Sequence, residues 1–300
     1  MILFSVPRTF SGDAGHSQRS AVESWKRLSP RPYIVLAGDE PGLADECAAL
    51  GTDYLAVRDR SEGGAPRLDA VFDAVRQRYP NQLLCYINAD IITLDPFVTP
   101  LLTVARHFEE FLVVGRRIDV DLADAIDFER DDWRQPVIEK ARRDGVMNDG
   151  TGSDFFAFTP NTFRAIPPFA IGRTAWDNWL MAEPLRLGFP LIDATPTITT
   201  FHQPHGYRHV SGSGAGFTDL WHLSRSHDAR RNYELMGGAL SVRTVLDATH
   251  ELMPADDGYV VRRLSPHKRF KGTLLRFNSA VRHGGRQMLE GLIQGRRHDR

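Results

Sequence analysis

Cysteine is scarce in this 300-residue chain, which contains only Cys47 and Cys85. The first lies in a predicted helix and the second in a predicted buried strand, so we interpret both as small apolar residues rather than as a disulfide. Long apolar runs are also absent, and the N-terminus enters a short predicted strand, residues 2–6, with no basic leader before it. We therefore expect a cytoplasmic protein with no export signal and no membrane span.

Several nucleotide and metal motifs are missing as well. The sequence has no G-x-G-x-x-G and no G-x-x-x-x-G-K-[ST], so the Rossmann dinucleotide-binding and P-loop classes lose support, and it has no H-E-x-x-H zinc helix. It also lacks internal repeats and a compact nucleic-acid recognition motif, so we expect no nucleic-acid partner. What is present is 42% hydrophobic residues, enough to form the core of one large domain or two.

Charge is distributed unevenly, although the formal net charge is only −1. From Tyr259 onward, eleven lysines and arginines face two acids, Glu290 and Asp299. The apolar residues of 262–300 recur at helical spacing, so this tail could be an amphipathic basic helix that makes peripheral contact with an anionic membrane. We favour the alternative, in which the helix packs on the rest of the protein with a solvated basic face.

Strand and helix signals alternate through the first half of the chain. This order predicts an α/β fold with an open, mostly parallel sheet flanked by helices. Later segments continue the pattern, with Pro196 interrupting the last strand. Strands are predicted at 2–6, 33–37, 53–57, 83–94, 111–115, 153–158 and 191–201, and helices at 17–28, 43–50, 68–79, 97–108 and 175–187.

The apolar run 83–94, LLCYINADIITL, contains Asn88-Ala89-Asp90 at a predicted strand end. In open α/β sheets, ligands bind at the carboxyl ends of the strands. A carboxylate there can hold Mg²⁺ or Mn²⁺ on a nucleotide diphosphate, whose developing negative charge must be neutralised when it leaves. By itself, the N-x-D pattern is equally compatible with an ordinary turn.

Two other strand ends are predicted on the same rim. Pro7-Arg8-Thr9 follows the first strand and Gly38-Asp39-Glu40 the second, so Asp39 could accept hydrogen bonds from a base or ribose and Arg8 could meet phosphate. Arg60 precedes Gly63-Gly64, Pro66 and a helix start, where amide groups and a nearby cation favour an anion. Ordinary turns and helix entries would have similar sequences.

Two more segments carry candidate acids. Gly152-Ser153-Asp154 precedes an aromatic strand, where glycine permits close approach of a sugar or phosphate and Asp154 could accept hydroxyl hydrogen bonds. Trp176-Asp177-Asn178 begins a helix, whose N-terminus should keep Asp177 ionised as a general base toward an acceptor hydroxyl, while Trp176 offers a face for a sugar ring. A hairpin turn and a simple helix cap with buried tryptophans remain the alternatives.

Three histidines follow the last predicted strand: His202, His205 and His209. Pro204 and Gly206 make a continuous zinc-binding helix improbable, so we interpret one histidine as completing a metal site begun by Asp90. The others would contact phosphate or acceptor. The glycine-rich stretch 211–216 is interpreted as a mobile lid.

In this order, Asn88-Ala89-Asp90, Gly152-Ser153-Asp154, Trp176-Asp177-Asn178 and the His202 cluster resemble the GT-A glycosyltransferases, particularly bacterial family 2-like members, over residues 1–235. The resemblance implies that Asp90 holds a divalent metal, Mn²⁺ or Mg²⁺, from the D-x-D position. It places Gly152 near the donor sugar, Asp177 at the catalytic carboxylate and His202 at a late metal-ligand position, with His205 as the fallback. Asn88 departs from the family pattern because it supplies no negative charge.

The implied reaction transfers a sugar from a nucleotide-diphosphate donor to a hydroxyl of a glycan, a lipid-linked or a small-molecule acceptor, with inversion at the anomeric carbon. The implied GT-A catalytic domain covers 1–235, with a nucleotide-binding half at about 1–115, an acceptor half at about 116–235 and a helical extension at 236–300. Two alternatives stay open: a metal-dependent hydrolase of nucleotide sugars or phosphoesters, and a non-catalytic sugar-nucleotide-binding module. We assign nucleotide-sugar binding to Pro7, Arg8, Thr9, Asp39, Arg60, Pro66, Asn88, Ala89, Asp90, Gly152, Ser153 and Asp154, and acceptor binding to Trp176 and Asn178.

Overall fold

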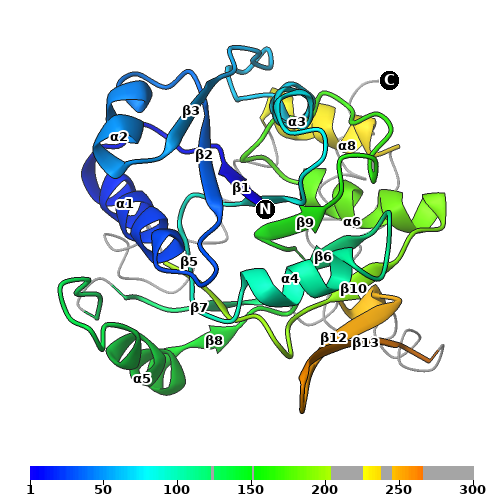
Figure 1. The fold of residues 1–300 in the computed structure, drawn as a ribbon. Helices are drawn as coiled ribbons and strands as arrows, with labels where there is room; N and C mark the ends of the chain where they lie inside the picture. Colours follow the sequence, from blue (N-terminus) through cyan, green and yellow to red (C-terminus); the bar gives the residue numbers. More distant parts are fainter. Residues whose placement is uncertain (123–124, 151, 204–225, 238–244, 266–300) are drawn as a thin grey trace, which may run out of the picture.

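The computed structural model describes residues 1–122, 125–150, 152–203, 226–237 and 245–265. Its largest feature is a nine-stranded sheet with the order β13-β12-β10-β6-β9-β4-β1-β2-β3 (Figure 1). β9 runs antiparallel to β4 and β6, β13 runs antiparallel to β12, and the other neighbouring pairs are parallel, as the sequence predicts for an open, mostly parallel sheet. The strands are β1 Ile2–Ser5, β2 Tyr33–Gly38, β3 Asp53–Ala56, β4 Leu84–Ile87, β6 Leu112–Val114, β9 Phe155–Phe158, β10 Leu191–Asp193, β12 His250–Ala255 and β13 Gly258–Arg263.

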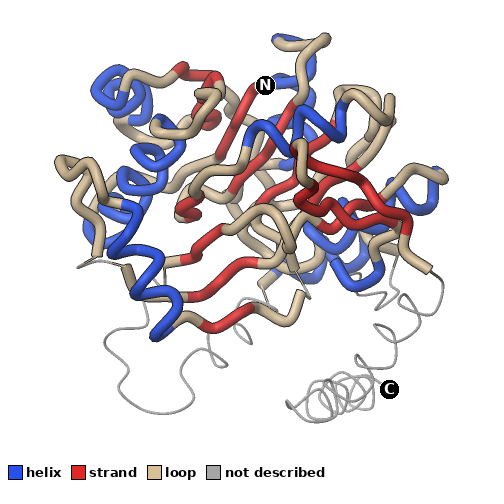
Figure 2. The backbone as a smooth tube through the Cα atoms, turned by 60° about the horizontal axis from the view of Figure 1, so that its bottom comes forward, coloured by secondary structure: helices blue, strands red, loops and turns tan. Residues whose placement is uncertain are grey.

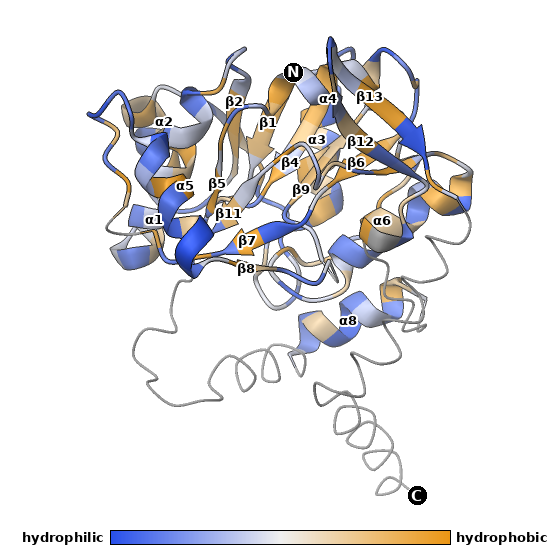
Figure 3. Ribbon diagram, turned by 90° about the horizontal axis from the view of Figure 1, so that it is seen from below, coloured by the Kyte–Doolittle hydropathy of each residue, from blue (hydrophilic) through white to orange (hydrophobic). Residues whose placement is uncertain are grey.

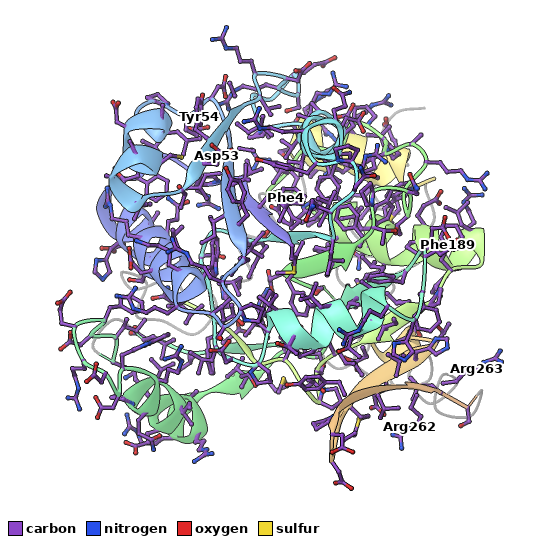
Figure 4. The ribbon with its side chains drawn as sticks, in the orientation of Figure 1. Phe4, Asp53, Tyr54, Phe189, Arg262 and Arg263 are labelled. Carbon is purple, nitrogen blue, oxygen red and sulfur yellow. The ribbon has the colours of Figure 1, made fainter. Side chains whose placement is uncertain are left out.

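Helices cover both faces of this sheet (Figure 2). The alternation of β1 shows why, since Ile2 and Phe4 belong to one core cluster and Leu3 to another. Phe4, on β1 (Figure 4), meets Phe72 of α3 edge-on. Their ring centroids are 5.2 Å apart. The first face packs against α3 Leu68–Arg78 and α6 Trp176–Leu187, and the second packs against α1 Gly12–Lys26, α2 Leu43–Leu50 and α4 Val98–Ala105.

A second, four-stranded sheet lies beside the first, in the order β5-β11-β7-β8. Its apolar side chains form a separate core with one helix, in which Phe201 and Ile92 pack with Trp133 and Val137. Figure 3 shows hydrophobic positions gathered on the strands of the large sheet and more hydrophilic positions along β7. The elements are β5 Ile91–Thr93, β7 Arg117–Asp119, β8 Val146–Met147, β11 Thr200–His202 and helix α5 Arg134–Asp144.

Two predicted strands are each divided between the sheets. The run 83–94 forms β4 in the large sheet and β5 in the small one, with Asn88-Ala89-Asp90 at the crossing. The run 191–201 likewise forms β10 and β11, and Pro196 lies between them. Because both runs pass directly from the large sheet into the small one, the two sheets meet at these crossings. The site described below lies at the first crossing.

The C-terminal part of the described chain differs from the predicted helical extension. After α8 His227–Leu235 and a short 3₁₀ turn, Val245–Asp247, residues 250–263 form the β12–β13 hairpin of the large sheet. Alternation explains the difference, because Tyr259 and Val261 pack against the core while Val260 and Arg262, on the opposite face of the strand, are exposed. The basic tail from 266 onward lies outside the described residues. Among those described, no helix is both long and apolar enough to span a bilayer.

Candidate active site

The predicted rim exists at the carboxyl edge of the large sheet. β1 pairs in parallel with both β2 and β4, so the residues that follow these three strands emerge on the same side. The segments are Pro7-Arg8-Thr9, Asp39-Glu40 and Asn88-Ala89-Asp90. The sequence therefore correctly predicts their common location, which follows from strand direction alone.

The small sheet adds residues from two other parts of the chain, on β7 and β11, to this edge. His202 of β11 is the register partner of Ile91 on β5, the residue after Asp90. On its other side, His202 is the register partner of Asp119 on β7. Residues directly opposite one another on neighbouring strands project to the same face, so strand pairing places Asp119 and His202 side by side, and Asp90, the residue before β5, lies next to this row.

His202 lies between two carboxylates. Its Nδ1 is 2.9 Å from Asp119 Oδ1, a hydrogen-bond distance, and its Nε2 is 3.7 Å from Asp90 Oδ2. Burial disfavours the charged form of Asp119, yet hydrogen bonds from His202 and Arg117 lower the pKa of its carboxyl below the usual range. An ionised Asp119 can only accept, so His202 Nδ1 must donate, which leaves the lone pair of a neutral imidazole on Nε2.

This donor set fits a divalent cation. A 3.7 Å separation is too long for a hydrogen bond and close to the spacing of two ligands that share one ion. A carboxylate oxygen is a ligand for both Mn²⁺ and Mg²⁺, an imidazole nitrogen is a ligand for transition-metal ions such as Mn²⁺, and a metal-bound histidine commonly donates its other N–H to a carboxylate. Within the described ranges, no group of three or more His, Cys, Asp or Glu side chains has metal-site spacing, so the remaining ligands would come from substrate, water or residues not described.

Arg117 and Asp119 are site residues that the sequence analysis missed. Arg117 donates from Nε to Asp119 at 2.8 Å and from Nη1 to Asp154 Oδ2 at 2.5 Å, which joins β7 to the segment before β9. The signal was present as Arg117-Ile118-Asp119, polar residues on alternate positions directly after a predicted strand. The intervening Gly115 and the irregular acidic sequence that follows concealed so short a strand.

Asn88 is turned toward the protein. Its Nδ2 donates to Asp154 Oδ1 at 2.7 Å, and its backbone N–H donates to the Asp154 carbonyl at 2.8 Å. Asp154 is only 7% exposed, so its two carboxylate oxygens are satisfied by Asn88 and Arg117 rather than offered to sugar hydroxyls. The position that resembles the first aspartate of D-x-D therefore holds a neighbouring acid in place.

Asp177 begins α6 beside the same network. Ala175, which precedes the helix, has φ of 84°, a left-handed conformation that costs a residue other than glycine about 1 kcal/mol or more. A Cβ on Gly152 would lie 2.7 Å from Asp177 Oδ2, so this glycine leaves the space that the carboxylate occupies. The two predicted motifs, around 152 and around 177, do meet.

Burial raises the pKa of the Asp177 carboxyl to about 6, and the negative charge of Asp154 adds to the rise. Backbone N–H groups of Asp177 and Asn178 and the Arg117 guanidinium act in the opposite direction. Burial therefore outweighs the stabilisation of the anion that we expected from the helix N-terminus. The result is a carboxylate that is still mostly ionised at neutral pH and is a stronger base than an ordinary aspartate.

Trp176 is not placed to receive a ligand. The side chain is 5% exposed and its ring lies 5.6 Å from both Tyr86 and Phe156, centroid to centroid, inside the core. This position fits the alternative of a buried tryptophan at a helix start better than a platform for a sugar ring.

At the first strand end, the loop is held by an amide side chain. Gln18 accepts from the Arg8 backbone N–H at 2.7 Å and donates to its carbonyl at 3.0 Å, which leaves the Arg8 side chain exposed. Thr9 donates to Glu40 at 2.9 Å. Arg60, predicted as a phosphate contact, donates instead to Asp39 at 2.5 Å and to Glu40 at 2.8 Å.

The Gly63-Gly64 turn already holds an anion of the protein itself. The Gly63 N–H donates to Asp228 Oδ1 at 3.2 Å and Ser61 Oγ donates to Oδ2 at 2.7 Å. Asp228, on α8, is 4% exposed. Of the amide groups that we expected to face a ligand phosphate, that of Gly63 is thus directed at this carboxylate and that of Gly64 donates to the Ser61 carbonyl. Pro66 lies in the same turn, in a β-bridge with Arg60. His205, His209 and the glycine-rich stretch 211–216 lie outside the described residues.

Several solved structures resemble this chain at low sequence identity. A proposed nucleotide-diphospho-sugar transferase of Desulfovibrio desulfuricans G20 is 11% identical with a TM-score of 0.42, and the match covers 79% of this chain and 96% of that one. S. aureus TarS 1–349, in complex with UDP-GlcNAc, is 7% identical with a TM-score of 0.43, covering 79% and 70%. GalNAc-T7 with UDP, GalNAc and Mn²⁺ is 13% identical with a TM-score of 0.42, covering 74% and 48%. No protein-family model matches the chain, and no curated protein matches it in sequence.

Proposed function

We propose that this protein is a glycosyltransferase that moves a sugar from a nucleotide-diphosphate donor to an acceptor hydroxyl, with a divalent cation and with inversion. The observation that carries the proposal is a single acidic cluster with two chemically different parts. One part is the Asp90–His202 pair, whose facing atoms suit a cation, and the other is Asp177, with a pKa of about 6. Asp154 is linked to both parts. It accepts a hydrogen bond from Asn88, in the same segment as Asp90, and its negative charge acts on Asp177.

Charge balance supports the cation. Among the described residues, the carboxyl groups of Asp90, Asp119, Asp154 and Asp177 belong to this network, and Arg117 contributes a guanidinium to it. Such an excess of negative charge would repel a nucleotide diphosphate. When bound between Asp90 and His202, Mn²⁺ or Mg²⁺ would reverse that field and neutralise charge on the departing diphosphate.

Asp177 is the residue for the proton transfer. In the proposed step the acceptor oxygen bonds to the anomeric carbon as the bond from that carbon to the diphosphate oxygen breaks, and the hydroxyl proton passes to the Asp177 carboxylate. One displacement of this kind inverts the configuration. The donor loops would hold the nucleotide, with Thr9, Asp39 and Arg8 at the ends of β1 and β2.

The donor site is tested by calorimetric titration of UDP, GDP and their common sugar conjugates, with Mn²⁺ and with EDTA. We expect one nucleotide to bind in the presence of Mn²⁺, and EDTA or Asp90→Ala to weaken binding at least tenfold. Asp73→Ala, which removes an exposed carboxylate from α3, is the matched control and should bind like the wild type. Failure of every nucleotide to bind, with or without metal, would refute the proposal.

The reaction is tested next with the nucleotide that binds. Release of that nucleotide should require an acceptor from a panel of glycans, lipid-linked saccharides and small alcohols. Release at the same rate without any acceptor would identify a hydrolase instead, and binding without turnover across the panel would identify a sugar-nucleotide-binding module.

Gly152→Ala should slow turnover about 10- to 100-fold, because displacing a catalytic group by even 1 Å can cost this much. The added Cβ would lie 2.7 Å from Asp177 Oδ2, so the carboxylate must move. Steady-state rates of Gly152→Ala alone and combined with Asp177→Asn measure the effect. In the combined variant the substitution should cost little more, since the displaced base is already absent. Unchanged turnover of the single variant would contradict this contact.

A further inference from the structure

We propose that Asp119 is the positioning residue for His202: its carboxylate accepts the Nδ1–H and so directs the Nε2 lone pair toward Asp90. The inference rests on the proposed function, in which Asp90 and His202 hold the cation. It gives a role to a residue that the family resemblance did not supply, on a strand that the sequence analysis did not predict. Asp119 touches His202 and not the reacting atoms.

The backbone fixes this arrangement. Asp119, His202 and Ile91 occupy one row across β7, β11 and β5, through parallel pairing on one side and antiparallel pairing on the other. The Val120 N–H also donates to the His202 carbonyl at 3.1 Å, which continues the pairing past the end of β7. The imidazole is therefore presented from the middle strand, with a carboxylate-bearing segment on each side.

Asp119 is itself held in place by a hydrogen bond from Arg117. The Oδ1 atom that receives His202 Nδ1 also accepts from Arg117 Nε at 2.8 Å, and Arg117 is fixed in turn by Asp154 at 2.5 Å. The side chains of Arg117, His202 and Asp119 are 25%, 20% and 36% exposed, so solvent screens this chain of contacts in part. Asp119 therefore has little freedom to release the imidazole.

The chemical consequence concerns the choice of ring nitrogen. A neutral imidazole carries one proton, and the hydrogen bond that one nitrogen makes decides which nitrogen is left as a ligand. A free histidine exchanges between both forms and rotates about its side-chain bonds. With Nδ1–H held by Asp119, His202 presents only Nε2 to a cation, and no rotation or proton shift must precede binding.

The first test is the affinity for Mn²⁺ alone, measured from the electron paramagnetic resonance signal of the free ion. Asp119→Asn and Asp119→Ala should each bind Mn²⁺ about 10- to 100-fold more weakly than the wild type, the usual cost of losing such a partner. Asp119→Glu should recover part of the affinity. Wild-type affinity in Asp119→Ala would overturn the inference.

The chain offers a closely matched control in Arg130 and Asp132. Like Arg117 and Asp119, they form an Arg-x-Asp pair with Nε and Oδ1 2.8 Å apart. This pair is exposed, and no contact with a histidine is recorded for it in the described part of the chain. Asp132→Asn should therefore leave Mn²⁺ affinity unchanged, and an equal loss in this variant would attribute the effect to general charge rather than to positioning.

The second test is independent of metal and of activity. Long-range ¹H–¹⁵N spectra of protein labelled with ¹⁵N-histidine, at pH 8 without metal, report the tautomer of each ring, and His202→Gln identifies the signals to follow. We expect the Nδ1–H form in the wild type and its loss in Asp119→Ala. The Nε2–H form in the wild type would overturn the inference.

The two tests separate this inference from the proposed function. If the wild type binds no Mn²⁺ while the Nδ1–H form depends on Asp119, the metal-dependent function fails and the positioning of His202 stands. If the wild type binds Mn²⁺ and the tautomer is unaffected by Asp119→Ala, the function stands and the positioning role is refuted.

Discussion

Asp177→Asn should lower the turnover of the proposed transfer about 100- to 10,000-fold, the usual contribution of a positioned general base. The asparagine side chain has the same size and keeps an oxygen that can accept hydrogen bonds from the backbone N–H groups. It cannot take up the proton. Donor affinity by calorimetry should change by less than about threefold, because binding is assigned to other groups. Full activity of the variant would remove Asp177 from this role.

The same carboxyl sets the pH dependence of the wild type. Burial raises its pKa to about 6, and a base works only when it is ionised. Activity should therefore be nearly constant from pH 7 to 8 and fall about tenfold for each pH unit below 6. Initial rates at subsaturating acceptor and saturating donor measure this fall in activity at acid pH. The residual activity of Asp177→Asn should not show it. If activity fell only near pH 4, the base would be an ordinary, solvated carboxylate.

Stability should move in the direction opposite to activity. The folded state binds the Asp177 proton more tightly than the unfolded state does, since the pKa rises from 3.8 to about 6. The ionised, partly buried carboxyl thus costs the folded protein at most about 3 kcal/mol above pH 6, a cost that disappears as the pH falls toward 4. Asp177→Asn should be more stable than the wild type at pH 8 and lose this advantage near pH 4.

Denaturant unfolding at pH 8 and pH 5 checks this expectation. Asp45→Asn is a suitable control, because Asp45 is also in the first turn of a helix, α2, but is exposed. It should change stability by less than about 0.5 kcal/mol at either pH. A less stable Asp177→Asn protein at pH 8 would mean that the carboxylate is a structural cap and not a strained base.

The sequence predicted what depends on strand direction and local pattern. Asp90, Asp39 and Arg8 lie on one rim because parallel strands end on the same side, and Asp177 begins a helix as its neighbours indicate. His202 was correctly linked to Asp90 as a near neighbour, although only pairing of β5 with β11 shows how they meet. These features need little knowledge of distant contacts.

The features that were missed depend on pairings between segments far apart in the chain. Arg117 and Asp119 acquire their roles only because β7 pairs with β11. Asp119 and His202 are 83 residues apart in the sequence. Asp228 reaches Gly63 across 165 residues and accepts from the Gly63 N–H, an amide group that looked available from the sequence. Trp176 was assigned to acceptor binding because a local pattern does not distinguish an indole beside a ligand from one packed in the core.

Asn88→Asp should damage the protein, although it would make the sequence more like the D-x-D pattern. In the structure Asn88 Nδ2 donates to Asp154 Oδ1 at 2.7 Å, and Asp154 is 7% exposed. An aspartate at this position would replace the donor with a second carboxylate at hydrogen-bond distance, so two negative charges would meet in a place with little water. We expect the free energy of unfolding to fall by about 2 to 4 kcal/mol at pH 8, with no gain in Mn²⁺ affinity.

Asn88→Ala separates the two parts of that effect, because it removes the hydrogen bond without adding charge and should cost only about 1 to 2 kcal/mol. The extra loss in Asn88→Asp is the repulsion from Asp154, and it should shrink between pH 8 and pH 5, where the two carboxyls can share one proton. Denaturant unfolding of both variants at these pH values, with Mn²⁺ titrations at pH 8, gives the comparison. Tighter Mn²⁺ binding by a stable Asn88→Asp protein would show that position 88 faces the cation, and that its bond to Asp154 yields when a carboxylate is supplied.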